Sequence, residues 1–180
     1  MKTCKALKLF SKEFWIDIIV VSILGTLLHF LYEFSGGNLL VAIFSAVNES
    51  VWEHIKIAVI PTYIVAIFKM WIIEERKCNL WSSLFFKIIT LIIIIPLLFY
   101  GYKSITNIEI LLLDIAIFYI SIIISEFVEF FIQNKIKISA KVEEVFKYLN
   151  ILLIGVFVLF TFMPPKLELF KDNTNNKFGI

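Results

Sequence analysis

Five stretches of almost continuous apolar residues divide the chain, and short segments richer in polar residues separate them. These stretches cover residues 14–32, 55–73, 84–102, 110–132 and 146–163. Each approaches or exceeds the roughly 17–25 residues that a helix needs to cross about 30 Å of hydrocarbon. The pattern therefore predicts an all-α, polytopic membrane helix bundle with about five transmembrane helices.

A polar turn and a short apolar piece lie between the first two predicted spans. Gly36, Gly37 and Asn38 form a turn signal that must end the first helix. Residues 39–47 are apolar but too short to cross a membrane, which predicts a short re-entrant or interfacial helix at the outer boundary. Ser50 and Glu53 fit a capping box, so the second span is expected to begin there. Residues 133–147 are expected to form a separate amphipathic surface segment.

Composition supports a membrane protein whose main partner is the lipid bilayer. The 180 residues are 60% hydrophobic and 16% aromatic, with a mean hydropathy of +0.91, whereas soluble domains are about half apolar. The formal net charge is only +2, and topology explains the spread of lysines, so nucleic-acid binding is not expected. We expect one domain over residues 1–165 and a polar, disordered extracytoplasmic tail over 166–180. Nothing in the sequence specifies the oligomeric state.

The basic residues predict the orientation of the spans. Twelve of the 17 Lys and Arg residues lie in the amino-terminal segment and in or beside the second and fourth connections, which alternating spans place on one side. Since Lys and Arg are retained on the cytoplasmic side, the amino terminus is expected in the cytoplasm and the carboxyl terminus outside. The first apolar run lacks a small-residue cleavage site, so we expect it to remain as an uncleaved span.

Ionisable residues cluster at the outer ends of the first two predicted spans. His29 and Glu33 are four residues apart and share a helical face, as Glu49 and Glu53 would. His54 follows directly, so both histidines of the protein lie in this region. An ionisable group at membrane depth costs roughly 2.5–3.5 kcal/mol on insertion scales, so such a cluster is by default a hypothesis of function.

Two histidines with several carboxylates form a ligand set that suits zinc or another divalent metal. We expect His29, Glu53 and His54 as metal ligands, and Glu49 or Glu33 as a general base. An open coordination position would permit hydrolysis of a lipid or small-molecule envelope substrate. The spacing does not match the established zinc-protease motifs.

A structural interpretation competes with the metal site. Carboxylates in the first turn of a helix are favourable against the helix dipole, which suits Glu49 and Glu53. Glu53 also has Lys56 three residues on as an ion-pair partner. In this interpretation the polar residues only fasten a helical hairpin, and the protein serves in membrane assembly.

The remaining polar candidates lie near the same boundary or deeper in the chain. Asn48 is, besides Ser50, a candidate to cap the second span, and Asp114 is placed to complete an outer pocket. Glu126 and Glu129 share a face of the fourth span and, with Asp17, form a second group toward the cytoplasm. This group favours either salt bridges near the interface or a cation path, as in a small transporter or permease component.

Two motifs carry a resemblance to a known family. The sequence H-F-L-Y-E at 29–33, followed by N-E-S-V-W-E-H at 48–54, resembles an uncharacterised family of small multi-span membrane proteins from low-GC Gram-positive bacteria and related anaerobes. The likeness covers mainly residues 25–63. It implies a location in the bacterial cytoplasmic membrane and implies no particular activity.

Overall fold

The computed structural model describes residues 8–72, 79–172 and 174–180. Within these ranges the chain forms α1 (Lys12–Phe34), α2 (Leu39–Ala42), α3 (Val51–Ile72), α4 (Leu80–Thr106), α5 (Leu111–Lys135), α6 (Ala140–Phe162) and the 3-10 turn η1 (Glu168–Phe170), and no strand. All the α-helices except α2 are long and apolar enough to cross a membrane. The prediction of an all-α polytopic bundle with five long helices and one short helix is confirmed.

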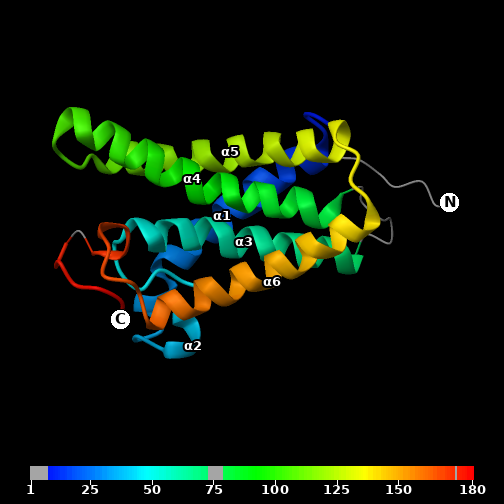
Figure 1. Cartoon of the computed structure of the whole chain (residues 1–180). Coiled ribbons are helices and arrows are strands. Elements are labelled where there is room, and N and C mark those ends of the chain that lie inside the picture. Colours follow the sequence, from blue (N-terminus) through cyan, green and yellow to red (C-terminus); the bar gives the residue numbers. More distant parts are fainter. Residues whose placement is uncertain (1–7, 73–78, 173) are drawn as a thin grey trace.

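The long helices run along a common axis, with α3 near the centre (Figure 1). This helix packs against α1, α4 and α5, while α6 covers α4. Burial agrees with the central position of α3. In its apolar stretch, 67% of the residues are buried inside the bundle, against 17–44% in the other long helices. The start of α1 and the carboxyl terminus lie at opposite ends of the bundle, as five crossings require (Figure 1).

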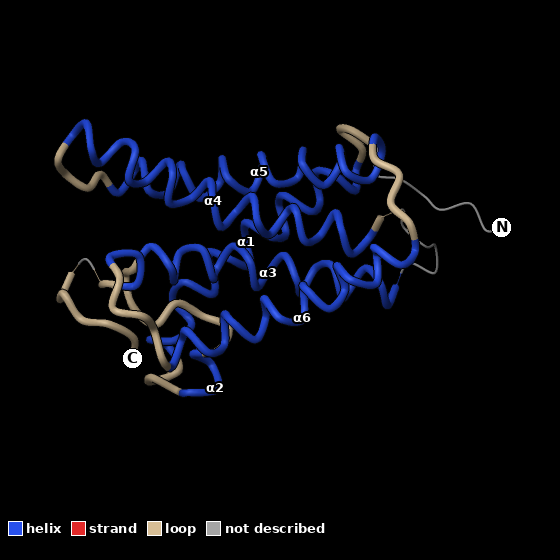
Figure 2. Tube along the Cα trace, in the orientation of Figure 1, coloured by secondary structure: helices blue, strands red, loops and turns tan. Residues whose placement is uncertain are grey.

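Connections gather at the two ends of the bundle (Figure 2). We call one of these the histidine end: it comprises residues 29–54, the α4–α5 turn at 107–110 and the segment from 163 to the carboxyl terminus. Polar side chains from these separate segments of the sequence come together there.

The helix α1 presents an apolar face to the surroundings and a closely packed face to the bundle. Ile16, Ile19, Ile23 and Leu27 are 52–61% exposed, as expected of side chains that contact lipid. Between helices in lipid there is little hydrophobic driving force, so close contact at small residues matters more. Gly25 is such a residue, since a Cβ there would lie 2.6 Å from the carbonyl oxygen of Ile57 in α3.

The expected surface segment over residues 133–147 is wrong. Its first three residues end α5 and residues 140–147 begin α6. The Ser139 side chain accepts a hydrogen bond from the backbone N–H of Val142, at 3.4 Å, and so caps α6. The amphipathic pattern therefore belongs to the ends of two long helices.

The carboxyl-terminal tail folds back onto the histidine end. Phe170 is buried against Trp52, with ring centroids 4.7 Å apart. Asp172 accepts hydrogen bonds of 2.7 Å from the backbone and hydroxyl of Thr174. Burial acts to raise the pKa of Asp172, but these hydrogen bonds lower it below its usual value. Where composition predicts disorder, the described tail residues thus make apolar and polar contacts that offset the entropy of ordering.

We predict that Gly25→Ala destabilises the bundle. The added Cβ would meet a backbone oxygen that cannot move without displacing α1 from α3, and overpacking of this kind costs about 1–3 kcal/mol. The matched control is Gly155→Ala in α6, where no atom lies within 4 Å of the new Cβ. Thermal unfolding of the detergent-purified variants measures the difference, and equal stability of the two variants would contradict the close contact.

Candidate metal centre

The connection between α1 and α3 turns back over the last turns of α1. Gly36 and Gly37 have φ values of 70° and 78°, a left-handed conformation that favours glycine. The Asn38 side chain then caps the one-turn helix α2. Beyond it, the backbone N–H of Ala46 donates to the carbonyl of Leu28 at 3.3 Å. Residues 46–49 therefore lie beside the end of α1.

Side-chain caps fix the start of α3. The Asn48 side chain accepts the N–H of Ser50 at 2.9 Å, and the Ser50 hydroxyl accepts the N–H of Glu53 at 3.3 Å. The Glu53 carboxylate does not return a bond to Ser50; it accepts the N–H of Val47 at 3.0 Å. Asn48 also donates to the carbonyl of Gly179 at 3.0 Å, which ties the tail to this connection.

His29, Glu49 and His54 point their ring nitrogens and a carboxylate oxygen at one another. The two Nε2 atoms are 3.4 Å apart, and Glu49 Oε2 lies 3.6 Å from each of them. In the plane of these three atoms, the point at equal distance from them lies about 2.0 Å from each. Zinc bonds to nitrogen and oxygen measure about 2.0–2.2 Å. The triangle therefore has the size of a zinc coordination face.

Hydrogen bonds fix the protonation of two of these side chains. His54 Nδ1 lies 2.9 Å from the carbonyl oxygen of Ser50. Because a carbonyl only accepts, Nδ1 carries the hydrogen and the neutral ring presents the Nε2 lone pair to the centre. The hydrogen bond with His29 lowers the pKa of Glu49 below its usual value, although partial burial acts to raise it. Glu49 is therefore ionised at neutral pH, as metal binding requires.

A small cavity opens beside His29 and Glu49. Its volume is about 90 Å³, enough for a few water molecules. It is lined by His29, Phe30, Tyr32, Glu33, Ala46, Val47, Asn48 and Glu49. Two of the three clustered side chains, His29 and Glu49, thus share this cavity with Glu33.

Glu53 lies apart from the histidines in a buried ion pair. Its Oε2 is 2.6 Å from Lys56 Nζ, and the two side chains are only 3% and 0% exposed. Lys56 also donates to the carbonyl of Ala42 and to the hydroxyl of Thr161, each at 3.0 Å. The structure therefore groups Glu49, and not Glu53, with the two histidines. The sequence indicated this ion pair, because Lys56 follows Glu53 by three residues.

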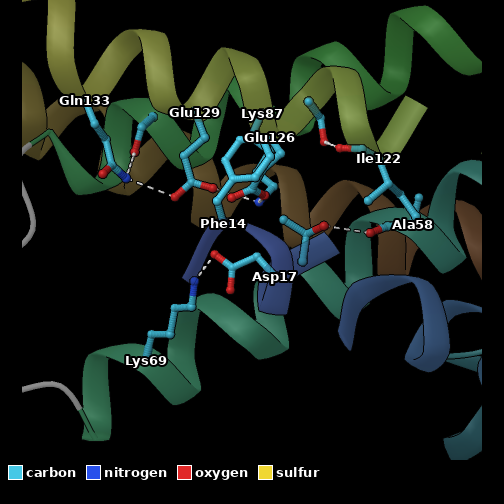
Figure 3. Close-up of polar contacts among 12 residues, drawn as sticks. Phe14, Asp17, Ala58, Lys69, Lys87, Ile122, Glu126, Glu129 and Gln133 are labelled. Atoms are coloured by element: carbon cyan, nitrogen blue, oxygen red, sulfur yellow. Dashed lines mark hydrogen bonds and ion pairs between the residues drawn. The ribbon is translucent and has the colours of Figure 1, made fainter. Parts of the chain in front are cut away.

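The other polar candidates lie outside this centre. Asp114 accepts a hydrogen bond of 2.5 Å from the hydroxyl of Tyr102, across the α4–α5 turn. Glu126 and Glu129 pair with Lys87 in the interior of the bundle and belong to a second acidic group. Among the described residues, three potential metal ligands come within 4.8 Å of one another in two groups. One is His29 with Glu49 and His54, and the other is the acidic group of Asp17, Glu126 and Glu129 (Figure 3).

The fold and this group define a class: a small polytopic membrane protein with two histidines and a carboxylate grouped at one end of its bundle. Within that class, the chain belongs to a family of unknown function, DUF6512, whose model matches residues 1–180. The resemblance to an uncharacterised family is thereby confirmed. No curated protein and no solved structure matches the chain.

We predict that Lys56→Met strongly destabilises the protein. Removal of the ammonium leaves the Glu53 carboxylate buried without its partner, which typically costs about 3–5 kcal/mol. The matched control is Lys103→Met, since Lys103 and its partner Glu109 are each 37% exposed and such pairs contribute only about 0–1 kcal/mol.

Thermal unfolding in detergent compares the two lysine variants. The double variant Glu53→Gln with Lys56→Met should recover much of the lost stability, because no charge then stays buried alone. A loss for Lys56→Met no greater than that for Lys103→Met would contradict the role assigned to the pair.

Proposed function

We propose that this membrane protein binds one divalent transition metal ion, zinc in the first instance, through His29, Glu49 and His54. The observation that carries the proposal is the triangle of Nε2, Nε2 and Oε2 atoms with sides of 3.4, 3.6 and 3.6 Å. Imidazole nitrogen and carboxylate oxygen are both common zinc ligands. Three protein ligands with a fourth position open to solvent are the arrangement of catalytic zinc sites.

The surroundings support this ligand set over a structural role for the same residues. Glu49 precedes α3 and its side chain is 46% exposed, so it is not needed to fill the interior. Fastening of the hairpin rests instead on the buried Glu53 and Lys56 pair. The Glu53–Lys56 pair thus holds His29 and Glu49 at the cavity wall, and the polar atoms of His29 and Glu49 contribute little to the fastening.

The proposed reaction class is hydrolysis of a lipid or of another small envelope substrate. Zinc, when bound, lowers the pKa of a coordinated water to about 7 and so supplies a nucleophile. Glu33 lies one helical turn beyond His29 and lines the same cavity, where it serves as the general base. Glu49, the other carboxylate considered for that role, is assigned as a ligand.

The proposed location is the bacterial cytoplasmic membrane, with the histidine end outside. The support is the distribution of charge toward the opposite end of the bundle. Lys12 begins α1, Lys135 ends α5, Lys137 lies in the α5–α6 connection, and Lys141 and Lys147 lie near the start of α6. Retention of basic residues in the cytoplasm places that end inside. The cavity then opens at the outer membrane surface, beside lipid and envelope substrates.

We predict that the detergent-purified protein, loaded with zinc and desalted, retains one zinc ion per chain by elemental analysis. His29→Ala and His54→Ala each remove a ligand, so each should weaken zinc binding by more than the roughly 10–100-fold caused by loss of an outer-shell partner. Glu49→Gln should weaken it as well, because an amide oxygen is a poorer ligand than a carboxylate.

The control for metal binding is Glu144→Gln, an exposed carboxylate in α6, which should leave the zinc content unchanged. Thermal unfolding verifies that each variant is folded. Absence of zinc from the loaded wild type, or equal zinc content in the double variant His29→Ala with His54→Ala, would refute the metal site.

We predict that Glu33→Gln separates catalysis from metal binding. The variant should keep its zinc and lose hydrolytic rate, by the roughly 10²–10⁴-fold that a general base contributes. The measurement is zinc-dependent cleavage of a fluorogenic long-chain acyl ester in mixed micelles. If the zinc-loaded wild type shows no cleavage beyond that of the His29→Ala variant, hydrolysis is excluded while metal binding stands.

A further inference from the structure

The carboxyl-terminal tail packs onto the start of α3. Phe170 is 4% exposed, and its ring centroid lies 4.7 Å from that of Trp52 and 5.3 Å from that of Phe160. Farther along, the tail turns back on itself, because the N–H of Asp172 donates to the carbonyl of Lys177 at 2.8 Å. An aromatic anchor and a closed turn thus hold the tail beside the residues that precede α3.

Two hydrogen bonds join this tail to Asn48 and Glu49. The side-chain amide of Asn48 donates to the carbonyl of Gly179 at 3.0 Å, while its oxygen accepts the N–H of Ser50. The backbone N–H of Glu49 donates to the carboxylate of Asp172. The tail therefore holds both the peptide that joins residues 48 and 49 and the side chain that precedes Glu49.

Glu49 needs such support to reach the histidines. It lies before α3, which begins at Val51, so no helix sets its direction. Its side chain is 46% exposed, and an exposed glutamate loses conformational entropy when it is held in one rotamer. A backbone that is already held lowers the cost of placing Oε2 at 3.6 Å from both imidazole Nε2 atoms.

The charge of Asp172 acts in the same direction. Thr174 and Asn175 donate to its two carboxylate oxygens at 2.7 and 2.8 Å, so this charge is fixed in place. It is close enough to the Glu49 carboxylate for the two to repel each other, which disfavours positions of Glu49 nearer the tail. The same negative charge attracts a cation bound at the histidines.

We propose that the docked tail positions Glu49 for metal binding, with Asp172 and Asn48 as the positioning residues. This inference rests on the proposed metal site of His29, Glu49 and His54, and adds that metal binding is coupled to docking of the tail. Coupling between two equilibria is reciprocal. A bound metal therefore favours the docked tail by the same factor by which the docked tail favours the metal.

Zinc affinity of the detergent-purified full chain, measured by competition with a chelator, tests the role of Asp172. Asp172→Ala removes both the charge and the acceptor for the Glu49 N–H, so zinc affinity should fall by the roughly 10–100-fold typical of groups that orient a ligand. Asp172→Asn keeps an acceptor oxygen and should recover part of this loss. The matched control is Glu168→Gln, which removes a charge from a 71% exposed side chain of the same tail and should leave zinc affinity unchanged.

Asn48→Ser tests the second contact while it keeps the local turn. A serine hydroxyl still accepts the N–H of Ser50, but it is too short to reach the carbonyl of Gly179. Zinc affinity should therefore fall, while thermal unfolding of the metal-free protein changes little. A purely structural role predicts the opposite result, with a lower unfolding temperature and unchanged zinc affinity of the folded protein.

Hydrogen exchange of the Glu49 amide measures the tail contact without any metal. NMR of protein labelled with ¹⁵N-glutamate follows this amide, and Glu49→Gln identifies its signal. The amide should exchange more slowly in the wild type and in Glu168→Gln than in Asp172→Ala. Equal exchange rates in the wild type and Asp172→Ala would overturn the contact on which the proposal depends.

Reciprocity gives a test that uses the wild-type tail. Zinc should slow tryptic cleavage after Lys177, which is exposed, and should have no such effect in His29→Ala. If zinc binds to the wild type and leaves this cleavage rate unchanged, the coupling is overturned.

These outcomes separate the positioning role from the metal site. A wild type that binds no zinc refutes the metal site and this inference with it. A wild type that binds zinc no more tightly than Asp172→Ala and Asn48→Ser leaves the metal site standing and refutes the positioning role alone.

Discussion

The buried ion pair between Glu53 and Lys56 is the interaction on which the histidine end depends. Lys56 joins the first turns of α3 to the carbonyl of Ala42 in α2 and to Thr161 in α6, while Glu53 holds the backbone of Val47. Each charge is buried and would be unsupported without the other. The connection from α1 to α3 is therefore held against the bundle, and this places Glu49 opposite His29.

Two hypotheses that competed for the same residues become separate in the structure. The clamp that fastens the hairpin uses Glu53 and Lys56, which are nearly inaccessible. The metal-ligand geometry uses His29, Glu49 and His54, whose side chains are 25–46% exposed beside a cavity. Because different side chains carry the two roles, a substitution in one group tests that role with less disturbance of the other.

The helix α1 links both polar sites while its outer face stays apolar. It carries Asp17 in the interior and His29 at the histidine end, and the large apolar side chains exposed between them are Ile19, Ile23 and Leu27. Lipid tails do not drive helices together, so contacts such as that of Gly25 with Ile57 and the buried ion pairs must hold α1 in place. The same contacts set the positions of both groups of ionisable side chains.

The sequence by itself determined the five long helices, the turn at Gly36 and Gly37 and the cap by Ser50, because length, hydropathy and local hydrogen bonds decide these features. It also located the cluster of histidines and carboxylates. It did not determine which carboxylate joins the histidines, because helical spacing applies only within a helix. Glu49 lies before α3, which begins at Val51, so its direction follows from the packed connection. The tertiary structure likewise decided that Glu53 turns to a buried lysine and that Lys69 meets Asp17 across two helices.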